Sequence, residues 1–422
     1  MRAMSRTQMT PAALTRELVA AWAPRYSRPR RAGVVLSMGS FTLTIVAGHS
    51  PVVCFWHDRG VTNRVLVFSH ACVVGTNQSV YAELRHLGYE VLLVTPNRWR
   101  HDFSPEPFHP DGHEGLEGCL LPLAVSLAGA PQRFRYRDSL RRNPVIRAFK
   151  PDVCIIEEES FSLAGWQCAR FARRCGVPYA IQAAENLNRA LPWPIKFCRR
   201  YVLRHASLVM ARSQAAGDRA VSWGAPVGVV DVVPHGIDDV VSEISPRREG
   251  VVGYVGRLVE SKGLSDLLAA VALNPSLSLE VVGDGPLRIL LDPPPPRVIW
   301  HGALTPERVA DFYQSISVLA LPSRTTPTWT EQFGRVIIES LAAGRPVVAY
   351  DSGEIPWVAD LTGITLVAEG DVDGLAAALS SNAYGDEGPT RAELGRSAVA
   401  HYFTNGAIAR RLSTWISGAT QS

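Results

Sequence analysis

Two glutamates eight positions apart, Glu331 and Glu339, frame a stretch that could bind a phosphorylated, hydroxyl-rich ligand. Apolar residues at helical spacing predict a helix over 333–343, which Gly344 and Pro346 end. A helix rises about 1.5 Å per residue, so Glu339 lies roughly 6–9 Å along the axis from the first turn. The free N–H groups of that turn favour an anion. The order of carboxylate, anion site and carboxylate fits a nucleotide sugar, although two solvated glutamates around an ordinary core helix fit the same spacing.

The segments before this helix have the pattern of strands that end in glycine or proline turns. They are 251–263 (VVGYVGRLVESKG), 279–286 (LEVVGDGP) and 318–324 (VLALPSR), and a further short strand is predicted over 347–350. The first turn carries Arg257 and Lys262, and Lys262 is notable because lysine occurs elsewhere only at positions 150 and 196.

The series GRL…KG, VVGDGP, LPS, E-x7-E and AAGRPVVAYDSGEIPWV resembles the donor half of retaining glycosyltransferases of family 4. The resemblance extends over about a hundred residues in the family's order. It implies an α/β protein with the GT-B fold, in which two Rossmann-like domains face each other across a donor/acceptor cleft. It also implies a nucleotide-sugar donor and no metal or other cofactor.

The resemblance assigns roles to individual residues of this half. Arg257 and Lys262 match the positions that hold the donor diphosphate, Glu331 the residue that faces the transferred sugar, and Glu339 the residue that binds the ribose. Backbone N–H groups near Gly334, with Arg335 beside it, complete the expected donor site. We expect Glu331, Arg257 and Lys262 to carry catalysis. Because no nucleophile is evident on the acceptor side, front-face attack by the acceptor hydroxyl is implied.

The first half of the chain opens with a strand over 64–68, a loop, a helix to Leu87 and a strand over 90–94, as in a Rossmann-type unit. The G-x-G-x-x-G fingerprint of dinucleotide sites is absent. In the resembled family this first loop reaches the donor phosphate, which Gly75 would do through its N–H. Ligands of such sheets bind at the carboxyl ends of strands. The strands over 152–156 and 179–183 end in acidic or amide residues, and the acceptor-side candidates are Glu157, Glu159, Glu185 and Asn186.

Two features leave the acceptor side open. Many family 4 enzymes carry a histidine near the end of the strand 179–183, where this chain has Gln182, Glu185 and Asn186. Between residues 97 and 144 the patterns weaken, and the histidines there (His101, His109 and His113) match no standard metal spacing, so we expect a loop beside the acceptor site and no metal.

Two basic–aromatic stretches, 133–142 and 191–205, are compatible with contact with an anionic membrane. A solvated face also explains the first stretch, and a core helix with arginines that reach the surface also explains the second. Residues 1–60 do not match the pattern of the rest, and we expect a disordered or spurious leader, with a membrane-associated segment as the alternative. The expected organisation is a leader over 1–60, an acceptor-side domain over 61–241, a linker over 242–250, a donor domain over 251–403 and a C-terminal helix over 404–422 that crosses back to the first domain.

Composition narrows the function. A net charge of +4 argues against nucleic acid as the main partner, and seven cysteines without a C-x-x-C pair indicate free thiols of a cytoplasmic protein. We expect a metal-independent hexosyltransferase that moves a sugar from a nucleotide-diphosphate sugar to a saccharide or lipid-linked hydroxyl, in polysaccharide or glycolipid assembly at the inner face of the cell membrane. An epimerase or phosphorylase of the same fold, and a nucleotide-sugar binding module without activity, are the alternatives.

Overall fold

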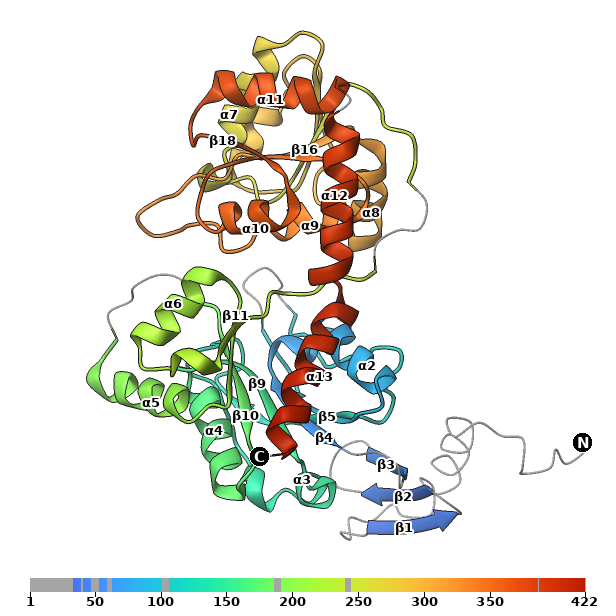
Figure 1. Cartoon of the computed structure of the whole chain (residues 1–422), viewed down its shortest axis with the longest axis vertical. Coiled ribbons are helices and arrows are strands. Elements are labelled where there is room, and N and C mark those ends of the chain that lie inside the picture. The colour runs from blue at the N-terminus through green and yellow to red at the C-terminus, as the bar shows by residue number, and fades with distance from the viewer. Residues whose placement is uncertain are drawn as a thin grey trace, which may run out of the picture. The chain divides into compact units, whose positions relative to one another are not determined.

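A computed structural model of the 422-residue chain describes the three strands 33–38, 41–46 and 53–58 and the segments 63–100, 106–185, 191–239, 244–385 and 387–421 (Figure 1). The chain divides into two compact units, residues 1–181, 205–207 and 413–422, and residues 182–204 and 208–412. The domain boundaries expected from the sequence stay a prediction.

The first large sheet has seven strands in the order β12-β11-β10-β9-β4-β5-β6. Their bounds are β4 Arg64–Ser69, β5 Glu90–Pro96, β6 Leu120–Leu123, β9 Val153–Glu159, β10 Tyr179–Ala183, β11 Leu208–Ala211 and β12 Val230–Val232. The pairs of β4 with β5 and with β9 are parallel. Strands β5 and β6 follow β4 on one side of the sheet, and β9 to β12 then follow on its other side. The strand order therefore reverses between β4 and β9.

The second large sheet has six strands in the order β15-β14-β13-β16-β17-β18, and all five neighbouring pairs are parallel. Their bounds are β13 Val251–Val255, β14 Ser278–Val282, β15 Val298–Trp300, β16 Val318–Leu321, β17 Val347–Tyr350 and β18 Thr365–Val367. Here the order reverses between β13 and β16. In such sheets ligands bind outside the carboxyl ends of the strands at the point of reversal.

Helices cover both faces of the second sheet, so its strands are apolar on both sides. Figure 1 shows α7 and α11 on one side and α9 and α10 on the other, and two separate clusters of buried side chains fill these layers. The α-helices within the described residues are α2 Ser79–His86, α3 Pro144–Phe149, α4 Leu163–Cys175, α5 Trp193–Arg204, α6 Gln214–Ser222, α7 Leu264–Leu273, α8 Pro306–Ser315, α9 Arg335–Ala342, α10 Ile355–Thr362, α11 Val372–Tyr384, α12 Glu387–Tyr402 and α13 Asn405–Gln421.

The strands predicted from the sequence are confirmed, with differences at their ends and in the middle of the first half. Strand β9 continues through Glu159, where the sequence analysis ended it at residue 156. The segment 97–144, which carried weak patterns, contributes β6 and the two-stranded antiparallel pair β7 (Val125–Ser126) and β8 (Arg135–Tyr136). These strands are too short for a clear alternation of apolar and polar residues.

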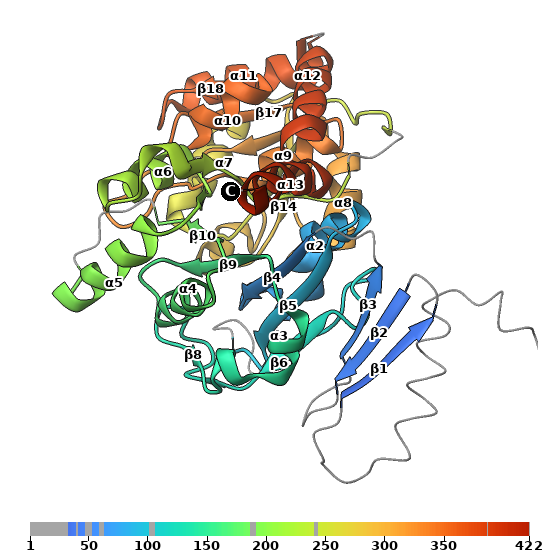
Figure 2. The same cartoon turned by 60° about the horizontal axis from the view of Figure 1, so that its bottom comes forward.

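The ends of the chain add two observations. Within the leader, β1 (Gly33–Met38), β2 (Phe41–Val46) and β3 (Val53–Asp58) form an antiparallel sheet (Figure 2), which the expectation of disorder did not anticipate. The end of α13, from Ser413, belongs to the first unit, where the Tyr89 hydroxyl lies 2.7 Å from Ser413 Oγ.

No helix within the described residues has the length and apolar character needed to cross a membrane.

Candidate active site

The reversal point of the second sheet gathers the basic turn after β13 and the end of β16. Gly263, with φ +69°, follows Lys262 and lies against the backbone of Pro322, just after β16. A Cβ atom on Gly263 would stand 1.8 Å from the Pro322 carbonyl oxygen, so only glycine permits this approach. The close contact brings the Lys262 turn next to the residues that follow β16.

Lys262 and Glu331 form an ion pair at this point. Lys262 Nζ lies 2.5 Å from Glu331 Oε2, and the same oxygen accepts a hydrogen bond of 3.0 Å from the buried Ser323 hydroxyl. The Lys262 ammonium also lies 4.8 Å from the centre of the Trp329 ring, within cation–π range. The structure therefore brings together two of the three residues expected to carry catalysis.

The backbone around Glu331 is fixed by a second glycine contact. Gly353 has φ +59°, and a Cβ atom there would stand 2.4 Å from the Glu331 carbonyl oxygen. The next residue, Glu354, donates its N–H to that same oxygen at 3.0 Å. The loop after β17 thus holds the main chain of Glu331, while Lys262 and Ser323 hold its carboxylate.

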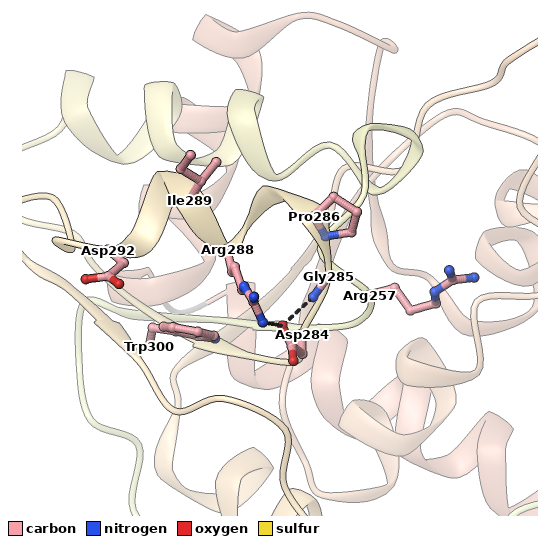
Figure 3. A pocket seen from close by; sticks show the side chains of 8 residues that line it. All are labelled: Arg257, Asp284, Gly285, Pro286, Arg288, Ile289, Asp292 and Trp300. Atoms are coloured by element: carbon pink, nitrogen blue, oxygen red, sulfur yellow. Dashed lines mark hydrogen bonds and ion pairs between the residues drawn. The ribbon is translucent and has the colours of Figure 1, made fainter. Parts of the chain in front are cut away.

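Arg257, in the same turn of the chain as Lys262, lines a pocket of about 910 Å³ (Figure 3). The other lining residues come from the turn after β14, the segment that follows it and β15, and they are Asp284, Gly285, Pro286, Arg288, Ile289, Asp292 and Trp300. Arg257 and Asp292 stand at opposite ends of this row, and Arg288 runs beside Asp284.

The main chain under Arg257 is held by a buried tyrosine. The Tyr254 hydroxyl donates to the Arg257 carbonyl oxygen at 2.9 Å. Burial and the nearby charge of Glu331 raise the pKa of this hydroxyl, which keeps it a donor at neutral pH. Tyr254 therefore holds the main chain at Arg257 and lies within the range of the Glu331 charge.

Helix α9 carries the remaining donor-site candidates. Gly334 precedes it in the left-handed region at φ +67°, a conformation that favours glycine. Glu339 accepts from Arg335 Nε at 2.8 Å and from the buried Tyr313 hydroxyl at 3.0 Å. Arg335 is thus engaged with Glu339 on the helix surface, and its expected contact with the donor stays a prediction.

The first sheet places the Gly75 and Glu157–Glu159 candidates near its own reversal point, but not as expected. The Gly75 N–H, expected to reach a phosphate, donates to Asp111 Oδ1 at 2.7 Å. A donor phosphate would have to replace this carboxylate. Glu157 and Glu159 lie within β9 and not in a loop after it. Glu185 follows β10, and Asn186 lies outside the described residues.

A histidine that the sequence analysis did not single out occupies the end of β4. The buried Glu158 carboxylate accepts from the His70 backbone N–H and lies next to the His70 ring nitrogen Nδ1, both at 2.8 Å. Of the histidines considered for a metal, His101 lies outside the described residues, and within those residues no group of three metal-ligating side chains includes His109 or His113.

Known proteins resemble this chain over most of its length. The family model described as "Glycosyl transferases group 1" matches residues 249–382, and the "Glycosyl transferase 4-like domain" model matches residues 74–236. A GDP-mannose-dependent alpha-mannosyltransferase of Mycolicibacterium smegmatis is 30% identical over 347 residues, which cover 76% of this chain and 83% of the relative. The chain belongs to the family 4 glycosyltransferases. It transfers a sugar from a nucleotide sugar to an acceptor.

Other proteins resemble this glycosyltransferase more distantly. A 2-deoxystreptamine glucosyltransferase of Streptomyces kanamyceticus is 28% identical over 55% of the chain and 68% of its own length. The structure of Anabaena HepE in complex with UDP is 18% identical with a TM-score of 0.60, covering 85% of this chain and all of that one. The predicted α/β, GT-B fold class is confirmed.

The residues that sequence reasoning missed in this glycosyltransferase are those that support the candidates. Ser323 lies in the LPS motif, which marked the strand end but not a bond to Glu331. The next residue, Arg324, makes a two-pronged ion pair with the buried Asp266, which also accepts from Tyr350. Trp300 and Asp292 carried no motif, because pocket walls are set by tertiary contacts.

Proposed function

We propose that this glycosyltransferase is a metal-independent, retaining hexosyltransferase that uses a GDP-sugar donor. The observation that supports it most is the Lys262–Glu331 ion pair at the reversal point of the second sheet, in the same turn as Arg257 of the pocket. In this proposal Arg257 and Lys262 stabilise the negative charge that develops on the leaving diphosphate, a task that metals perform in other enzymes. Glu331 then orients the transferred sugar and favours its oxocarbenium-like state.

The ion pair has a chemical consequence for the bound donor. In this proposal Lys262 contacts both the Glu331 carboxylate and the diphosphate. It therefore keeps these two groups close to the bond that breaks. The sugar carbon that becomes positive would lie toward Glu331, and the phosphate oxygen that becomes negative would lie toward Lys262. This order of charges matches that of the transition state and not that of the ground state, which is how electrostatic catalysis acts.

The pocket also supports the choice of guanine. Asp292 presents an exposed carboxylate at the end of the pocket away from Arg257 (Figure 3). Guanine offers two adjacent N–H donors that a carboxylate accepts together, whereas uracil and adenine lack this pair. The Mycolicibacterium smegmatis relative is named as GDP-mannose-dependent. We therefore place the base toward Asp292 and the diphosphate toward Arg257.

A thermal-shift panel of GDP-, UDP-, ADP- and TDP-sugars tests this donor assignment. A donor at one hundred times its Kd adds about 2.7 kcal/mol of stability. We expect GDP-sugars alone to raise the melting temperature of the wild type. The Arg257→Ala variant should lose the shift, because a phosphate contact is removed.

Two aspartate variants complete the panel. Asp292→Asn should weaken GDP-sugar binding by about tenfold or more, since a bidentate pair contributes about 1–3 kcal/mol. Asp360→Asn changes an exposed aspartate on α10 and should leave the shift intact. A rise in melting temperature with UDP-sugars and none with GDP-sugars would show that the donor carries uracil and not guanine. No shift with any sugar nucleotide would count against the donor site itself.

We also propose that α5 rests on an anionic membrane surface. Trp193 and Phe197 are 77% and 62% exposed, and their rings stack with centroids 6.2 Å apart. Lys196, Arg200 and Arg204 are exposed on the same helix, which carries no acidic residue. In contrast Arg199 is buried, with its guanidinium 3.9 Å from the centre of the Trp223 ring. An exposed face with aromatic and basic residues is typical of helices that lie on lipid headgroups.

The other basic–aromatic stretch, 133–142, does not form such a face. Phe134 and Tyr136 are buried in the core while the arginines around them are exposed, because side chains alternate across the short strand β8. Membrane contact through α5 would suit a lipid-linked acceptor at the inner face of the cell membrane, and thus glycolipid or polysaccharide assembly.

Vesicle co-sedimentation tests the α5 proposal. The Trp193→Ala/Phe197→Ala variant should bind phosphatidylglycerol vesicles at least about tenfold more weakly than the wild type, because two apolar side chains no longer enter the headgroup region. Leu394→Ala, which removes a side chain 63% exposed on α12, serves as the matched control. Equal binding by the double variant and the wild type would contradict the proposal.

A further inference from the structure

The reversal point of the first sheet, between β4 and β9, has a prebuilt polar site. Ser69, at the end of β4, is in register with Glu157 of β9, so the next residues, His70 and Glu158, are neighbours. This position is equivalent to that of Arg257 and Ser323 in the second sheet. By the rule for parallel sheets, a ligand of the first sheet is expected at this point.

The bonds between His70 and Glu158 determine which ring nitrogen faces outward. Glu158 is 1% exposed and accepts the His70 backbone N–H through Oε1. Its Oε2 lies 2.8 Å from His70 Nδ1. A carboxylate only accepts hydrogen bonds, so Nδ1 carries the proton. The neutral ring then has its acceptor at Nε2, as in enzymes where a carboxylate orients a histidine.

Two buried aromatic rings fix the orientation of this imidazole. The Trp99 and Phe134 rings lie 4.7 and 5.6 Å from it, centre to centre, and both are almost fully buried. The His70 side chain itself remains 23% exposed. Because Nδ1 is turned to Glu158, the exposed edge of the ring carries Nε2. The site is therefore rigid on three sides and open at one hydrogen-bond acceptor.

The surrounding charges favour an uncharged ligand. Glu157 and Glu159 flank Glu158 on the same strand, and the charges of all three glutamates act on the His70 imidazole. A phosphate would meet repulsion from this group, whereas a hydroxyl can donate to Nε2.

We propose that His70, oriented by Glu158, binds a hydroxyl group of an uncharged saccharide acceptor through Nε2. This inference rests on the proposed transfer to a hydroxyl acceptor and assigns the acceptor-side group of that reaction. It also selects among acceptors, since phosphorylated saccharides are disfavoured at the same point.

Nucleotide release from GDP-mannose, measured with and without acceptor, tests the proposal. The neutral probes are the methyl α-glycosides of mannose, glucose and galactose, and the charged probes are the three hexose 6-phosphates. In the wild type we expect the neutral set to stimulate release above the rate of donor hydrolysis and the charged set not to do so. In His70→Ala the stimulated rate should be at least about tenfold lower than in the wild type. Donor hydrolysis and the thermal shift with GDP-mannose should be unchanged.

Further variants separate binding from folding. His70→Gln keeps an acceptor near the position of Nε2 and should recover part of the stimulation. Glu158→Gln keeps the buried volume but no longer fixes the tautomer, so it should raise the KM for the acceptor more than it lowers kcat. His86→Ala removes the histidine of an exposed pair with Glu83 on α2 and should behave as the wild type.

Protonation gives an independent readout. Burial lowers the pKa of His70. The charge and hydrogen bond of Glu158, together with the charges of Glu157 and Glu159, raise this pKa by more than burial lowers it, so the net shift is upward from 6.5. Below this pKa, Nε2 carries a proton and cannot accept. The stimulated rate should therefore fall on acidification at a pH above the ordinary histidine range, and His70→Gln should lose this dependence.

The possible failures are distinguishable. Full stimulation in His70→Ala, stimulation by the phosphates alone, or no stimulation by any neutral probe would each overturn the role of His70. Absence of both donor hydrolysis and a donor thermal shift in the wild type would instead contradict the proposed function.

Discussion

Replacing Lys262 with methionine is expected to lower kcat by about 10²–10³-fold and to destabilise the protein by about 2–3 kcal/mol. The activity falls because a cation at the leaving diphosphate is lost. The stability falls because Glu331, with 9% of its side chain exposed, keeps only the Ser323 hydroxyl as a partner for Oε2. The stability figure lies below that of a fully buried pair because the Lys262 side chain is 21% exposed.

A double variant separates the two effects. Lys262→Met/Glu331→Gln removes both charges, so it should recover most of the lost stability in urea unfolding while kcat remains low. Lys150→Met changes an exposed lysine in the first half of the chain and controls for general loss of lysine. If the double variant were as unstable as Lys262→Met, the ion pair would not be the source of the destabilisation.

Glu331→Gln alone should lower kcat by about 10²–10³-fold and leave the donor Kd unchanged or tighter. Glutamine has the same shape and can still accept from Ser323, but it carries no negative charge toward the sugar. Lys262, released from its ion pair, then has its full charge available for the diphosphate. The loss is therefore confined to the transition state.

Single-turnover rates with GDP-mannose and donor titrations on the same variant measure this difference. Glu260→Gln, an exposed residue two positions before Lys262, is the control for charge removal in this loop. Normal turnover in Glu331→Gln would remove Glu331 from the mechanism, and an equal loss of affinity and turnover would make it a binding residue only.

The donor half could be predicted from the sequence because its residues lie in short motifs next to strands and helix α9. The order of Arg257, Lys262, Glu331 and Glu339 follows from the chain alone. The ion pair between Lys262 and Glu331 does not, because it depends on the contact of Gly263 with Pro322, about sixty residues away. The same holds for the pocket wall at Asp292 and Trp300.

The first half of the chain was harder to predict from the sequence for a related reason. His70 is a single residue at a strand end, and its partner Glu158 lies 88 positions later. The three glutamates indicated the end of a strand, but β9 continues through them, and the carboxylate of Glu158 is buried and bonded to His70. The role expected of Gly75 met a similar obstacle, because nothing local to its loop predicts the bond to Asp111.

The glycine contacts at positions 263 and 353 also bear on how this enzyme can acquire new donors. Both involve backbone against backbone, so the geometry of Lys262 and Glu331 depends on main-chain shape and tolerates no added side chain there. The far wall of the pocket is different, since Ile289 and Asp292 are exposed and hold no part of that geometry. Directed evolution can therefore vary Ile289 and Asp292 independently of Lys262 and Glu331. In the proposed donor site, such variants would change the preference for the nucleotide base and leave the reactive centre unchanged.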